Sequence, residues 1–436
     1  MATIEVNEQF QTTFELIENS KQNLLVLGKA GTGKSTFLDF CRNQTTKKMA
    51  VLAPTGVAAI NIGGATIHSF FGFSIDITLE KIKKLPKHDK RCKLLEQLET
   101  IVIDEISMIR ADLLDCVAKF LELNGPYPIE PFGGIQMVFI GDLYQIPPVV
   151  KKEVATFFKT FYQSPYFFSA KSYITHASSF TLIEFEKIYR QTDSSFINLL
   201  NAIRNNTVTN VHLVELNKRY QPSFKAKENE FWVYITGTNK AVKRINDIML
   251  NRLKNQEKVY QAKITGETQQ ESFPTDTELR LKVGAQIMMV NNDQSGRWNN
   301  GTLGKIIEIE RDLEHDLIVV QLANKEVVRV APNSWDIFQY GVDEETNSLR
   351  TIKVGDFTQY PMRLAWALTV HKSQGKTFTN VILDLATTFS PGQMYVALSR
   401  CTNLDGLVLK KPITAKSIFI DQQVVEFLGR FKQVAC

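Results

Sequence analysis

The sequence predicts an α/β protein with two parallel-sheet domains and a small β-rich insertion in the second. In the first half, short apolar runs rich in β-forming residues alternate with helical stretches, and each run ends in a loop that contains Gly, Pro or Asp. The same alternation starts again near residue 231. Between about residues 286 and 357, alternating segments separated by turns replace the helical periodicity, which is typical of a small β-barrel.

The predicted strands place the domains along the chain. In the first domain, strands are expected at residues 23–27, 49–53, 100–103 and 136–140. In the second domain, they are expected at 231–235, 364–369, 381–384 and 407–409, and in the insertion at 305–310, 317–322 and 326–330. Because the insertion interrupts an α/β pattern, the pieces on either side of it are expected to form one domain.

The composition is that of a soluble globular protein with more than one core. The chain has 436 residues, of which 44% are hydrophobic and 22% are charged. No apolar run is long enough to span a membrane, and the first ten residues lack the pattern of a signal peptide. The five cysteines form no C-x-x-C pair, so neither a disulfide framework nor a zinc site is expected, and a reducing cytosol fits best.

Positive charge gathers in one stretch, although the formal net charge is only +5. The basic residues of this stretch are Lys81, Lys83, Lys84, Lys87, His88, Lys90, Arg91 and Lys93. Two interpretations remain open on charge alone. The stretch is either a solvated surface or a contact surface for a polyphosphate such as nucleic acid.

The strand at 23–27 leads into a phosphate-binding loop. Residues 28–35 read GKAGTGKS and match G-x-x-x-x-G-K-[ST] between a strand and a helix, as this motif requires. Glycine-rich turns let backbone N–H groups face phosphate oxygens, and the helix start adds partial positive charge. Lys34 is expected to reach the β- and γ-phosphates, and Ser35 to bind Mg²⁺. The predicted nucleotide-binding residues of this loop are Gly28, Ala30, Gly31, Thr32, Gly33, Lys34, Ser35 and Thr36.

Two further strand ends carry side chains suited to nucleotide hydrolysis. Asp104 and Glu105 follow the strand at 100–103. Asp104 is expected beside Mg²⁺, and Glu105 is expected to orient or deprotonate the attacking water. Gln145 follows the strand at 136–140 and is a candidate to sense the γ-phosphate and report its loss to a surface that binds a track.

Taken in order, these motifs resemble those of superfamily-one helicases. The matching segments are 28–35, 53–56 (APTG), 104–108 (DEISM), 141–148 (GDLYQIPP), 189–191 (YRQ), 370–375 (VHKSQG) and 395–400 (YVALSR). The stretch 108–135, with DLLD and PFGGI, is similar to the signature of the petite-integration-frequency (PIF) helicases. The resemblance spans about residues 6–410. It implies ATP as the nucleotide and 5′-to-3′ movement on single-stranded DNA.

The resemblance also implies a domain layout. The first RecA-like domain would comprise residues 1–68 and 96–185, and the second 186–285 and 358–436. The basic residues 69–95 would form a small insertion that touches the single strand and the fork. Residues 286–357 would form a barrel resembling Src-homology-3 domains.

Several nucleotide contacts follow from the resemblance alone. Arg190 and Arg400 would reach the γ-phosphate from the second domain, so that hydrolysis depends on closure of the two domains. Gly375 would lie at the nucleotide. The family also places a glutamine before the first helix's aromatic to read adenine. In this chain Phe10 occupies the expected position, so Gln9 is our choice and Gln11 is the alternative.

The DNA contacts that the resemblance implies are spread over both domains. Hydroxyl, amide and backbone N–H groups suit sugar–phosphate contacts that do not read sequence. Exposed aromatics such as Phe70, Phe71 or Trp298 are candidates to stack on bases, although core positions would serve Phe70 and Phe71 equally well. The implied contact residues are Pro54, Thr55, Thr66, His68, Phe70, Thr238, Asn239, Asn300, Gly301, His371, Lys372 and Ser373.

We therefore expect an ATP- and Mg²⁺-dependent 5′-to-3′ DNA helicase acting on single-stranded DNA and on forked or tailed duplexes. Further candidate substrates are G-quadruplexes and RNA–DNA hybrids, and candidate roles are replication, recombination, repair and telomere-type maintenance. A helicase subunit of a recombination nuclease and a DNA-stimulated translocase without strand separation remain alternatives. We expect a monomer in solution, no membrane partner, and a bacterial cytoplasmic protein associated with the nucleoid.

A phosphate-loop kinase and a nucleic-acid-binding scaffold with a degenerate ATP site fit less well. The kinase would lack the second α/β unit and its arginines. The scaffold would not need an intact set of Lys34, Ser35, Asp104, Glu105, Gln145 and Arg400.

Overall fold

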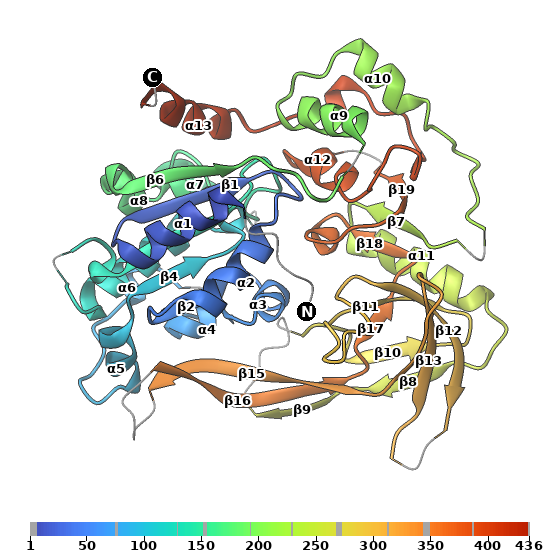
Figure 1. Ribbon diagram of the computed structural model, residues 1–436, viewed down its shortest axis with the longest axis horizontal. Helices are drawn as coiled ribbons and strands as arrows, with labels where there is room; N and C mark the ends of the chain where they lie inside the picture. Colours follow the sequence, from blue (N-terminus) through green and yellow to red (C-terminus); the bar gives the residue numbers. More distant parts are fainter. Residues whose placement is uncertain are drawn as a thin grey trace. The chain divides into compact units, whose positions relative to one another are not determined.

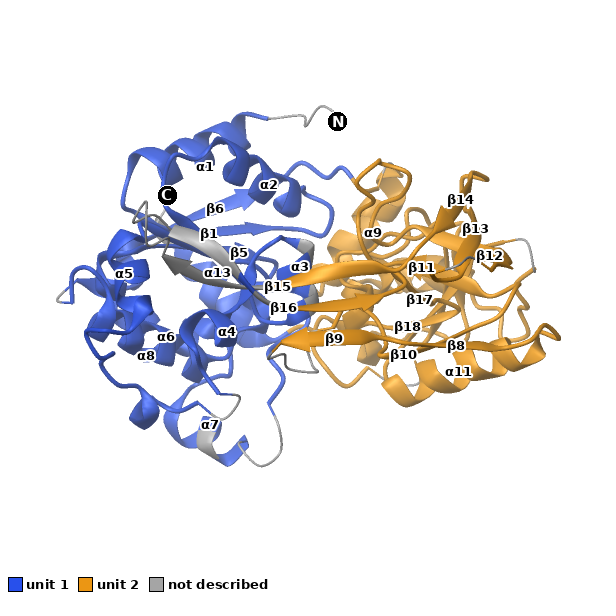
Figure 2. Cartoon of the chain, turned by 90° about the horizontal axis from the view of Figure 1, so that it is seen from below, with its two compact units in different colours: residues 1–189, 338–354, 421–436 blue, residues 190–337, 355–420 orange. Residues whose placement is uncertain are grey.

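The computed structural model describes residues 7–74, 77–128, 130–150, 155–191, 193–227, 230–266, 273–311, 314–342, 349–385 and 388–434. The chain divides into two compact units, coloured separately in Figure 2. Unit 1 contains residues 1–189, 338–354 and 421–436, and unit 2 contains residues 190–337 and 355–420.

Unit 1 is built on a six-stranded parallel sheet in the order β3-β2-β4-β5-β1-β6, of which β1, β2, β4 and β6 are labelled in Figure 1. The four predicted strands of the first domain are confirmed, and their ends differ from the prediction by at most one residue. Two strands were not predicted: β3 has only two residues, and β6 is partly exposed along its length. The strands are β1 (Asn23–Gly28), β2 (Met49–Ala53), β3 (Ala65–Thr66), β4 (Thr100–Ile103), β5 (Gln136–Gly141) and β6 (Phe180–Phe185).

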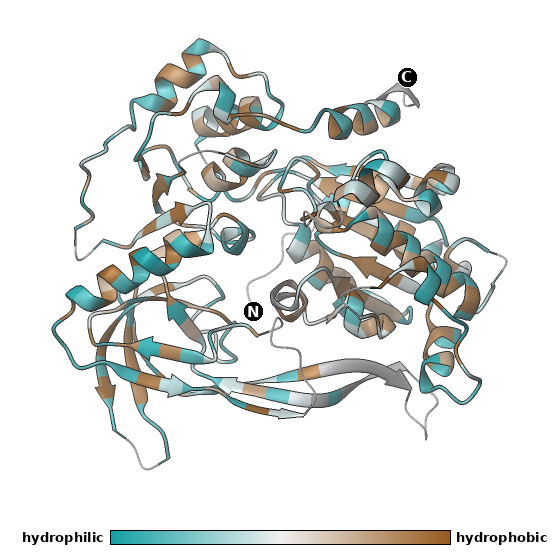
Figure 3. Ribbon diagram, turned by 180° about the vertical axis from the view of Figure 1, so that it is seen from behind, coloured by the Kyte–Doolittle hydropathy of each residue, from teal (hydrophilic) through white to brown (hydrophobic). Residues whose placement is uncertain are grey.

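Helices cover both faces of this sheet, because successive strand residues point to opposite sides. Leu24 and Val26 pack in one cluster with α1, α2 and α3, whereas Leu25 and Leu27 pack in the other cluster with the remaining helices. In Figure 3 the sheet strands are mostly hydrophobic, whereas the surrounding helices alternate in character. The helices are α1 (Glu8–Asn19), α2 (Lys34–Gln44), α3 (Gly56–Asn61), α4 (Ile67–Phe71), α5 (Lys90–Gln97), α6 (Ala111–Asn124), α7 (Ala155–Phe161), α8 (Lys171–Thr175) and α13 (Gln422–Val434).

The C-terminal helix α13 belongs to unit 1, so the assignment of residues beyond 420 to the second domain is wrong. The ring of Phe427 stacks on that of Phe168, with centroids 4.3 Å apart, and also contacts Tyr173. Gln423 donates a hydrogen bond to the carbonyl of Gln163 at 2.9 Å. An apolar face on α13 therefore completes the core around α8, a long-range pairing that sequence position does not reveal.

Unit 2 contains a four-stranded parallel sheet in the order β18-β7-β19-β20. Its strands are β7 (Trp232–Thr236), β18 (Ala367–Thr369), β19 (Asn380–Asp384) and β20 (Leu407–Leu409). The helices of this unit are α9 (Ser194–Arg204), α10 (Asn210–Asn217), α11 (Asn239–Arg252) and α12 (Gln393–Leu398). The predicted single strand at 364–369 is instead two short strands, because β18 joins the parallel sheet while β17 (Met362–Leu364) pairs elsewhere.

The antiparallel part of the chain extends beyond the predicted range 286–357. A five-stranded sheet has the order β14-β13-β12-β11-β17, and two smaller sheets have the orders β10-β8 and β15-β16-β9. Strands on both sides of the predicted range take part because they share one core, in which Leu279, Ile287 and Met362 are packed together. Residues 338–354, in contrast, group with unit 1. The bounds are β8 (Lys258–Gln261), β9 (Lys263–Gly266), β10 (Glu278–Leu281), β11 (Gln286–Met289), β12 (Leu303–Glu310), β13 (Leu317–Leu322), β14 (Val327–Val330), β15 (Asn333–Val342) and β16 (Leu349–Gln359).

None of the helices within the described ranges is long and apolar enough to cross a membrane.

A buried carboxylate ties α6 to α8 inside unit 1. Asp115, in the DLLD segment, is 4% exposed. Its oxygens accept hydrogen bonds from the Tyr162 hydroxyl at 2.9 Å, from the Lys171 N–H at 3.2 Å, and from the N–H and hydroxyl of Ser172 at 2.8 Å each. The carboxylate therefore satisfies the first donors of α8, which has no cap of its own.

Replacing Asp115 with Ala should remove the acceptor shared by the Tyr162 hydroxyl, the Lys171 N–H and the two donors of Ser172, and lower the free energy of unfolding of unit 1 by about 3 kcal/mol or more. Denaturant-induced unfolding measures this loss. Asp112→Ala is the matched control, because Asp112 forms a more exposed ion pair with Arg110 and should cost about 1 kcal/mol or less. Equal losses in the two variants would contradict the anchoring role of Asp115.

Candidate nucleotide and nucleic-acid sites

The motif loops of unit 1 leave the sheet at one edge. Because β4, β5 and β1 are parallel neighbours, their carboxyl ends lie together. The register pairs Leu27 with Gly141 and Ile103 with Phe139, so the three strands end nearly level. The phosphate loop, the acidic pair and the loop of Gln145 are thereby brought together.

The phosphate loop has the backbone that its glycines predict. Gly31 and Gly33 adopt φ values of 87° and 80°, which a residue with a side chain rarely adopts. A Cβ on Gly28 would lie 2.4 Å from Thr32 Oγ1. The Thr32 side chain is buried and donates to the carbonyl of Lys29 at 3.0 Å, so it braces the loop from inside. The helix α2 begins at Lys34, directly behind this turn.

Lys34 and Asp104 are electrostatic neighbours at the base of the loop. The ammonium of Lys34 donates to the carbonyls of Gly28 at 2.7 Å and Lys29 at 3.0 Å. Burial raises the pKa of Asp104, while the Glu105 N–H and the charge of Lys34 act in the opposite direction. A buried carboxylate beside a cation is a suitable partner for Mg²⁺, and Asp104 and Ser35 supply the hard oxygen ligands that this ion prefers.

Glu105 and Gln145 follow the neighbouring strands. Glu105 has φ 51° and ψ 44°, a left-handed conformation that costs a non-glycine residue about 1–3 kcal/mol and is found most often at functional sites. Gln145 is buried, and its amide donates to Asp142 at 3.3 Å. A Cβ on Gly141 would lie 2.9 Å from Ile106, so β5 packs tightly against the turn that follows Glu105.

The two candidate glutamines at the start of α1 differ in their burial and in their hydrogen-bond partners. Gln9 is half-buried; its amide donates to the carbonyl of Glu184 at 3.1 Å and its oxygen accepts from the Glu186 N–H at 3.3 Å. Gln11 is exposed and donates to Glu15 at 3.0 Å on the outside of the same helix. Phe10, at the position expected for the glutamine, is instead a core residue between Phe37 and Phe185.

Two residues near Gln9 were missed as site candidates. The Tyr189 N–H donates to the carbonyl of Gly31 at 2.8 Å, which places Tyr189 against the phosphate loop. Asn7 caps α1 and also donates to the Tyr189 hydroxyl at 3.0 Å. The signals in the sequence are the YRQ motif for Tyr189 and an asparagine directly before a helix for Asn7.

The two arginines of the second unit differ in their surroundings. Arg190 is half-buried and donates to the carbonyl of Gly375 at 3.3 Å. Arg400 is 1% exposed, and its guanidinium donates to the carbonyls of Val396, Ser373 and Lys376 and to the Ser399 hydroxyl. Arg400 is thus held in the interior of unit 2 by these hydrogen bonds.

The predicted DNA-contact threonines are helix N-caps. The side chains of Thr55, Thr66 and Thr238 accept from the N–H groups of Ala58, Ser69 and Ala241, at the starts of α3, α4 and α11. Thr55, Thr238 and Asn239 are exposed, whereas Pro54, Thr66 and His68 are half-buried. The threonines therefore lie at helix starts, where further backbone N–H groups are available to phosphates.

Four residues predicted as DNA contacts or stacking aromatics are buried, so Phe70 and Phe71 take the core positions that were the alternative, and Trp298 is not the exposed aromatic that was expected. Phe70, Phe71 and Trp298 are 5%, 1% and 5% exposed and belong to the cores of their units. Ser373 is fully buried, and its hydroxyl donates to the carbonyl of Val370 at 2.8 Å. Apolar packing holds Phe70 and Phe71 in the core of unit 1, whereas hydrogen bonds to Val370 and Arg400 hold Ser373 inside unit 2.

Two of the remaining predicted contacts of unit 2, Asn300 and Gly301, lie at Lys376. Lys376 donates to the side-chain oxygen of Asn300. A Cβ on Gly301, which has φ 100°, would lie 3.2 Å from Lys376 Cδ. His371 is half-buried, which lowers its pKa, and Lys372 is exposed.

The basic stretch of unit 1 is a solvent-facing surface held by apolar anchors. Ile82, Leu94 and Leu95 are buried, whereas the lysines around them and His88 are exposed. Arg91 is the exception, because it pairs with Asp89 at 2.8 Å and donates to the carbonyl of Phe71. The lysines of this stretch therefore present their charge to solvent.

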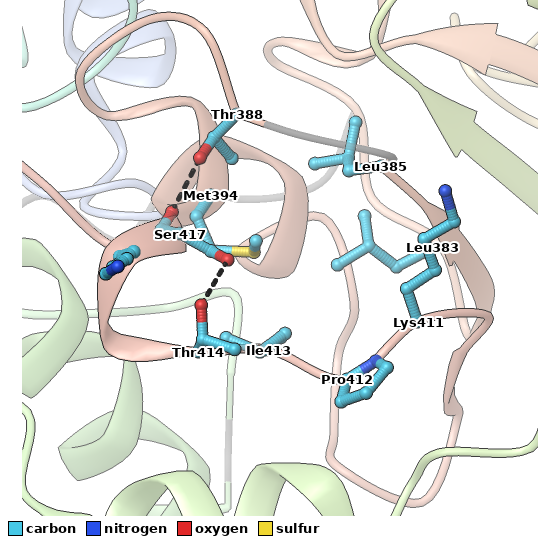
Figure 4. A pocket seen from close by; sticks show the side chains of 10 residues that line it. Leu383, Leu385, Thr388, Met394, Lys411, Pro412, Ile413, Thr414 and Ser417 are labelled. Carbon is cyan, nitrogen blue, oxygen red and sulfur yellow. Dashed lines mark hydrogen bonds between the residues drawn. The ribbon is translucent and has the colours of Figure 1, made fainter.

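Unit 2 also contains a cavity of about 410 Å³ that lies apart from these predicted residues (Figure 4). Leu383, Leu385, Met394 and Ile413 form its apolar wall, and Lys411 and Lys416 are among its lining residues. The hydroxyls of Thr414 and Ser417 are within 3.1 Å of each other. None of the predicted nucleotide or DNA residues lines it.

Comparison with known proteins identifies the family. The family model of PIF1-like helicases matches residues 4–212. The model of the 2B domain of the DNA helicase Pif1 matches residues 267–309. An ATP-dependent DNA helicase Pif1 of Bdellovibrio bacteriovorus is 31% identical over 98% of this chain and 93% of its own length. A Pif1 of Campylobacter jejuni is 30% identical over 93% of this chain and 94% of its own.

Solved structures agree with this result. Bacteroides Pif1 in complex with ADP-AlF4 has a TM-score of 0.87 and 37% identity, covering 98% of this chain and 97% of its own. Bacteroides Pif1 bound to ssDNA has a TM-score of 0.71 and 36% identity, covering 99% and 98%. These relatives confirm the expected layout of two RecA-like domains with a small inserted β domain. The chain therefore belongs to the PIF1-like helicase family and is an enzyme of the helicase and ATPase class.

Proposed function

We propose that this enzyme hydrolyses ATP with Mg²⁺ to move 5′ to 3′ along single-stranded DNA and to separate the strands of forked or tailed duplexes. The observation that carries the proposal is the common edge of β4, β5 and β1, where Lys34, Asp104, Glu105 and Gln145 follow level strand ends. Relatives support the DNA partner: Bacteroides Pif1 has been solved bound to ssDNA, and another structure concerns unwinding of forked dsDNA by two coordinating Pif1 helicases.

In this proposal the residues of unit 1 bind the triphosphate and prepare the water. The N–H groups of the loop and the ammonium of Lys34 bind phosphate oxygens, while Ser35 and Asp104 hold the metal ion, which neutralises charge on the phosphates. Glu105 accepts the proton of the attacking water, and Gln145 senses the γ-phosphate. Gln9 reads the adenine edge in this proposal, since it bonds to the backbone on either side of Phe185, the strand partner of Gly28, whereas Gln11 bonds to Glu15 on the exposed side of α1.

We further propose that Arg190 and Arg400 stabilise the charge that develops on the γ-phosphate. Arg190 is the more accessible of the two. The hydrogen bonds of Arg400 to Ser373 and Lys376 also suit a second task, which is to transmit the nucleotide state to the turn that carries His371 and Lys372. Gly375 accepts from Arg190 and belongs to the same turn.

For the DNA track we propose contacts from helix starts and exposed polar groups of both units. Thr55, Thr66 and Thr238 would bind phosphates together with the N–H groups beside them, which fits binding that does not read sequence. Asn239, Asn300, Gly301, His371 and Lys372 would continue the path in unit 2. The family resemblance supports a monomer in a bacterial cytoplasm, associated with the nucleoid, with G-quadruplexes and RNA–DNA hybrids as further substrates and roles in repair and recombination.

Unwinding of matched partial duplexes with either a 5′ or a 3′ single-stranded tail tests this proposal. ATP-dependent strand separation of the 5′-tailed duplex, with little of the 3′-tailed duplex, is the expected result. A preference for the 3′ tail would contradict the proposed polarity. DNA-stimulated hydrolysis without separation of either duplex would favour a translocase.

Glu105→Gln should slow hydrolysis by about 10² or more while ATP binding is retained, because the amide keeps the size of the side chain but cannot accept the proton. Single-turnover hydrolysis and nucleotide titration measure the two effects. Glu105→Gly is the matched control for strain: glycine adopts the φ of 51° freely, so this variant should unfold within a few degrees of wild type and still not hydrolyse ATP. Near-normal turnover of Glu105→Gln would exclude Glu105 as the base.

Arg400→Ala should lower the rate of hydrolysis by roughly 10³ while ATP affinity stays within about threefold, if the guanidinium acts in the transition state. Because Arg400 is buried, thermal unfolding must be recorded in parallel. Arg190→Ala is the matched variant, since Arg190 is less buried and should show the kinetic effect with less loss of stability. Normal hydrolysis with only a lowered melting temperature would assign Arg400 a purely structural role.

Lys83, Lys84 and Lys87 changed together to Ala should weaken binding to forked DNA about tenfold at 0.1 M salt and make the salt dependence less steep, because fewer counterions are released. Fluorescence anisotropy across a salt series measures both quantities. Lys48, Lys159 and Lys171, three other exposed lysines of unit 1, provide the charge-matched control. If the slope of log affinity against log salt concentration equals that of the wild type, the stretch is a solvated surface that does not contact the DNA.

A further inference from the structure

Hydrogen bonds fix the walls of the cavity in unit 2 (Figure 4). The Thr388 hydroxyl donates to the carbonyl of Ser417 at 2.9 Å. The side chain of Asn217, at the end of α10, donates to the carbonyl of Ile413 and accepts from its N–H, both at 2.8 Å. The cavity is therefore formed without a ligand, and its volume of about 410 Å³ falls within the range of roughly 300–1,000 Å³ that is typical of small-molecule sites.

The interior of this cavity is apolar. Leu383 lies on β19, Leu385 follows that strand, and Met394 lies on α12, while Ile413 closes the other side. All four side chains are buried, and Figure 4 shows Leu383 and Met394 pointing into the same space. The unbranched thioether of Met394 can adapt to the shape of a group that it contacts. These walls suit a ligand with an aliphatic or aromatic body.

The mouth of the cavity is positively charged. Lys411 and Lys416 are exposed lining residues, and neither forms an ion pair or a hydrogen bond with a residue in the described ranges. The neighbouring Lys410, in contrast, donates to the carbonyls of Pro222 and Phe224 at 2.9 and 2.7 Å. None of the described lining residues is acidic. A ligand with an apolar body therefore gains further affinity from an anionic group that stays at the mouth.

Met394 connects this cavity to Arg400. Both belong to the arginine motif: Met394 lies on α12, and the Arg400 Nε donates to the carbonyl of Val396 in the same helix at 2.9 Å. A ligand packed against Met394 stabilises this placement of α12 and, with it, the arrangement in which Arg400 is buried in its own unit. Because the proposed contact with the γ-phosphate requires the guanidinium to reach the nucleotide, an occupied cavity should slow hydrolysis.

We propose that this cavity is a regulatory site for a small amphipathic anion, with an aliphatic or aromatic body and one carboxylate, sulfonate or phosphate group. The body fills the space between Leu383, Met394 and Ile413, and the anionic group stays at the mouth, where Lys411 and Lys416 supply positive charge. Binding is independent of the proposed function, whereas the effect on hydrolysis rests on the role proposed for Arg400.

Fluorescence titration of the full chain with anilinonaphthalenesulfonate tests the binding site, because this probe joins aromatic rings to one sulfonate. Phenylnaphthylamine, the same ring system without the sulfonate, is the uncharged control ligand. Lys411→Met and Lys416→Met together keep the apolar stems, so they should weaken binding of the sulfonate about tenfold and leave that of the uncharged probe within about twofold. Lys243→Met and Lys254→Met together, at two exposed lysines of unit 2 outside the cavity, should change neither affinity.

Variants that fill the cavity test its apolar part. Ile413→Phe places a larger side chain inside and should lower the affinity for both probes about tenfold or more. Thr414→Phe, at an exposed position of the lining, is the second filling variant and decides the matter where Ile413→Phe folds poorly. Thermal unfolding recorded in parallel establishes that each variant is folded.

The rate of DNA-stimulated ATP hydrolysis tests the regulatory effect. Saturating anilinonaphthalenesulfonate should lower the rate of the wild type about fivefold or more. The double variant at Lys411 and Lys416 should keep its full rate at the same probe concentration, and its rate without the probe should equal that of the wild type.

The results that would overturn this inference differ from those that would overturn the proposed function. Equal affinity for the sulfonate in the wild type, the double lysine variant and the filling variants would show that the probe binds elsewhere. An unchanged rate of hydrolysis by the wild type at saturating probe would overturn the regulatory role. A wild type that never hydrolyses ATP would overturn the proposed function and with it the effect on hydrolysis, while binding of the sulfonate in the predicted pattern would still support the site.

Discussion

The level parallel ends of β4, β5 and β1 are the constraint on which the rest of the molecule depends. Each strand is buried on both faces, so its register cannot slip without moving apolar side chains out of two cores. Close contact between Gly141 and Ile106 fixes the neighbouring turns to one another. Hydrophobic packing of the strands therefore fixes the positions of Lys34, Asp104 and Glu105. The same packing holds Glu105 in its left-handed backbone conformation.

In unit 2, hydrogen bonds around the buried guanidinium of Arg400 hold the motif segments in position. Arg400 joins Ser373 and Lys376, and Gln191 donates to the carbonyl of Ser399 at 3.1 Å. The arginine motif, the turn after β18 and, through Lys376, the turn at Asn300 thus form one polar network. A change at the arginine can reach the proposed DNA contacts through contiguous bonds, which is a physical basis for coupling hydrolysis to movement.

Features that depend on a local pattern could be predicted from the sequence. Features that depend on contacts between segments far apart in the chain could not. Strands at 49–53, 100–103 and 407–409 match in full, and the phosphate loop has the φ values that its glycines imply. The place of α13 in unit 1 depends on Phe427 meeting Phe168, which no local pattern encodes. Motif order likewise placed Ser373 in the site but could not show that it is buried. The role of Asp115 as an anchor for α8 emerged only from the fold.

The most direct test of the account is the rate of ATP hydrolysis with and without single-stranded DNA, in the wild type and in Lys34→Ala. The account predicts that oligonucleotides stimulate the wild type, and that Lys34→Ala shows no hydrolysis under either condition because the phosphates lose their main counter-charge. Two results would contradict a DNA-coupled motor that uses this loop: an equal rate of hydrolysis by the wild type with and without DNA, or near-normal turnover by Lys34→Ala.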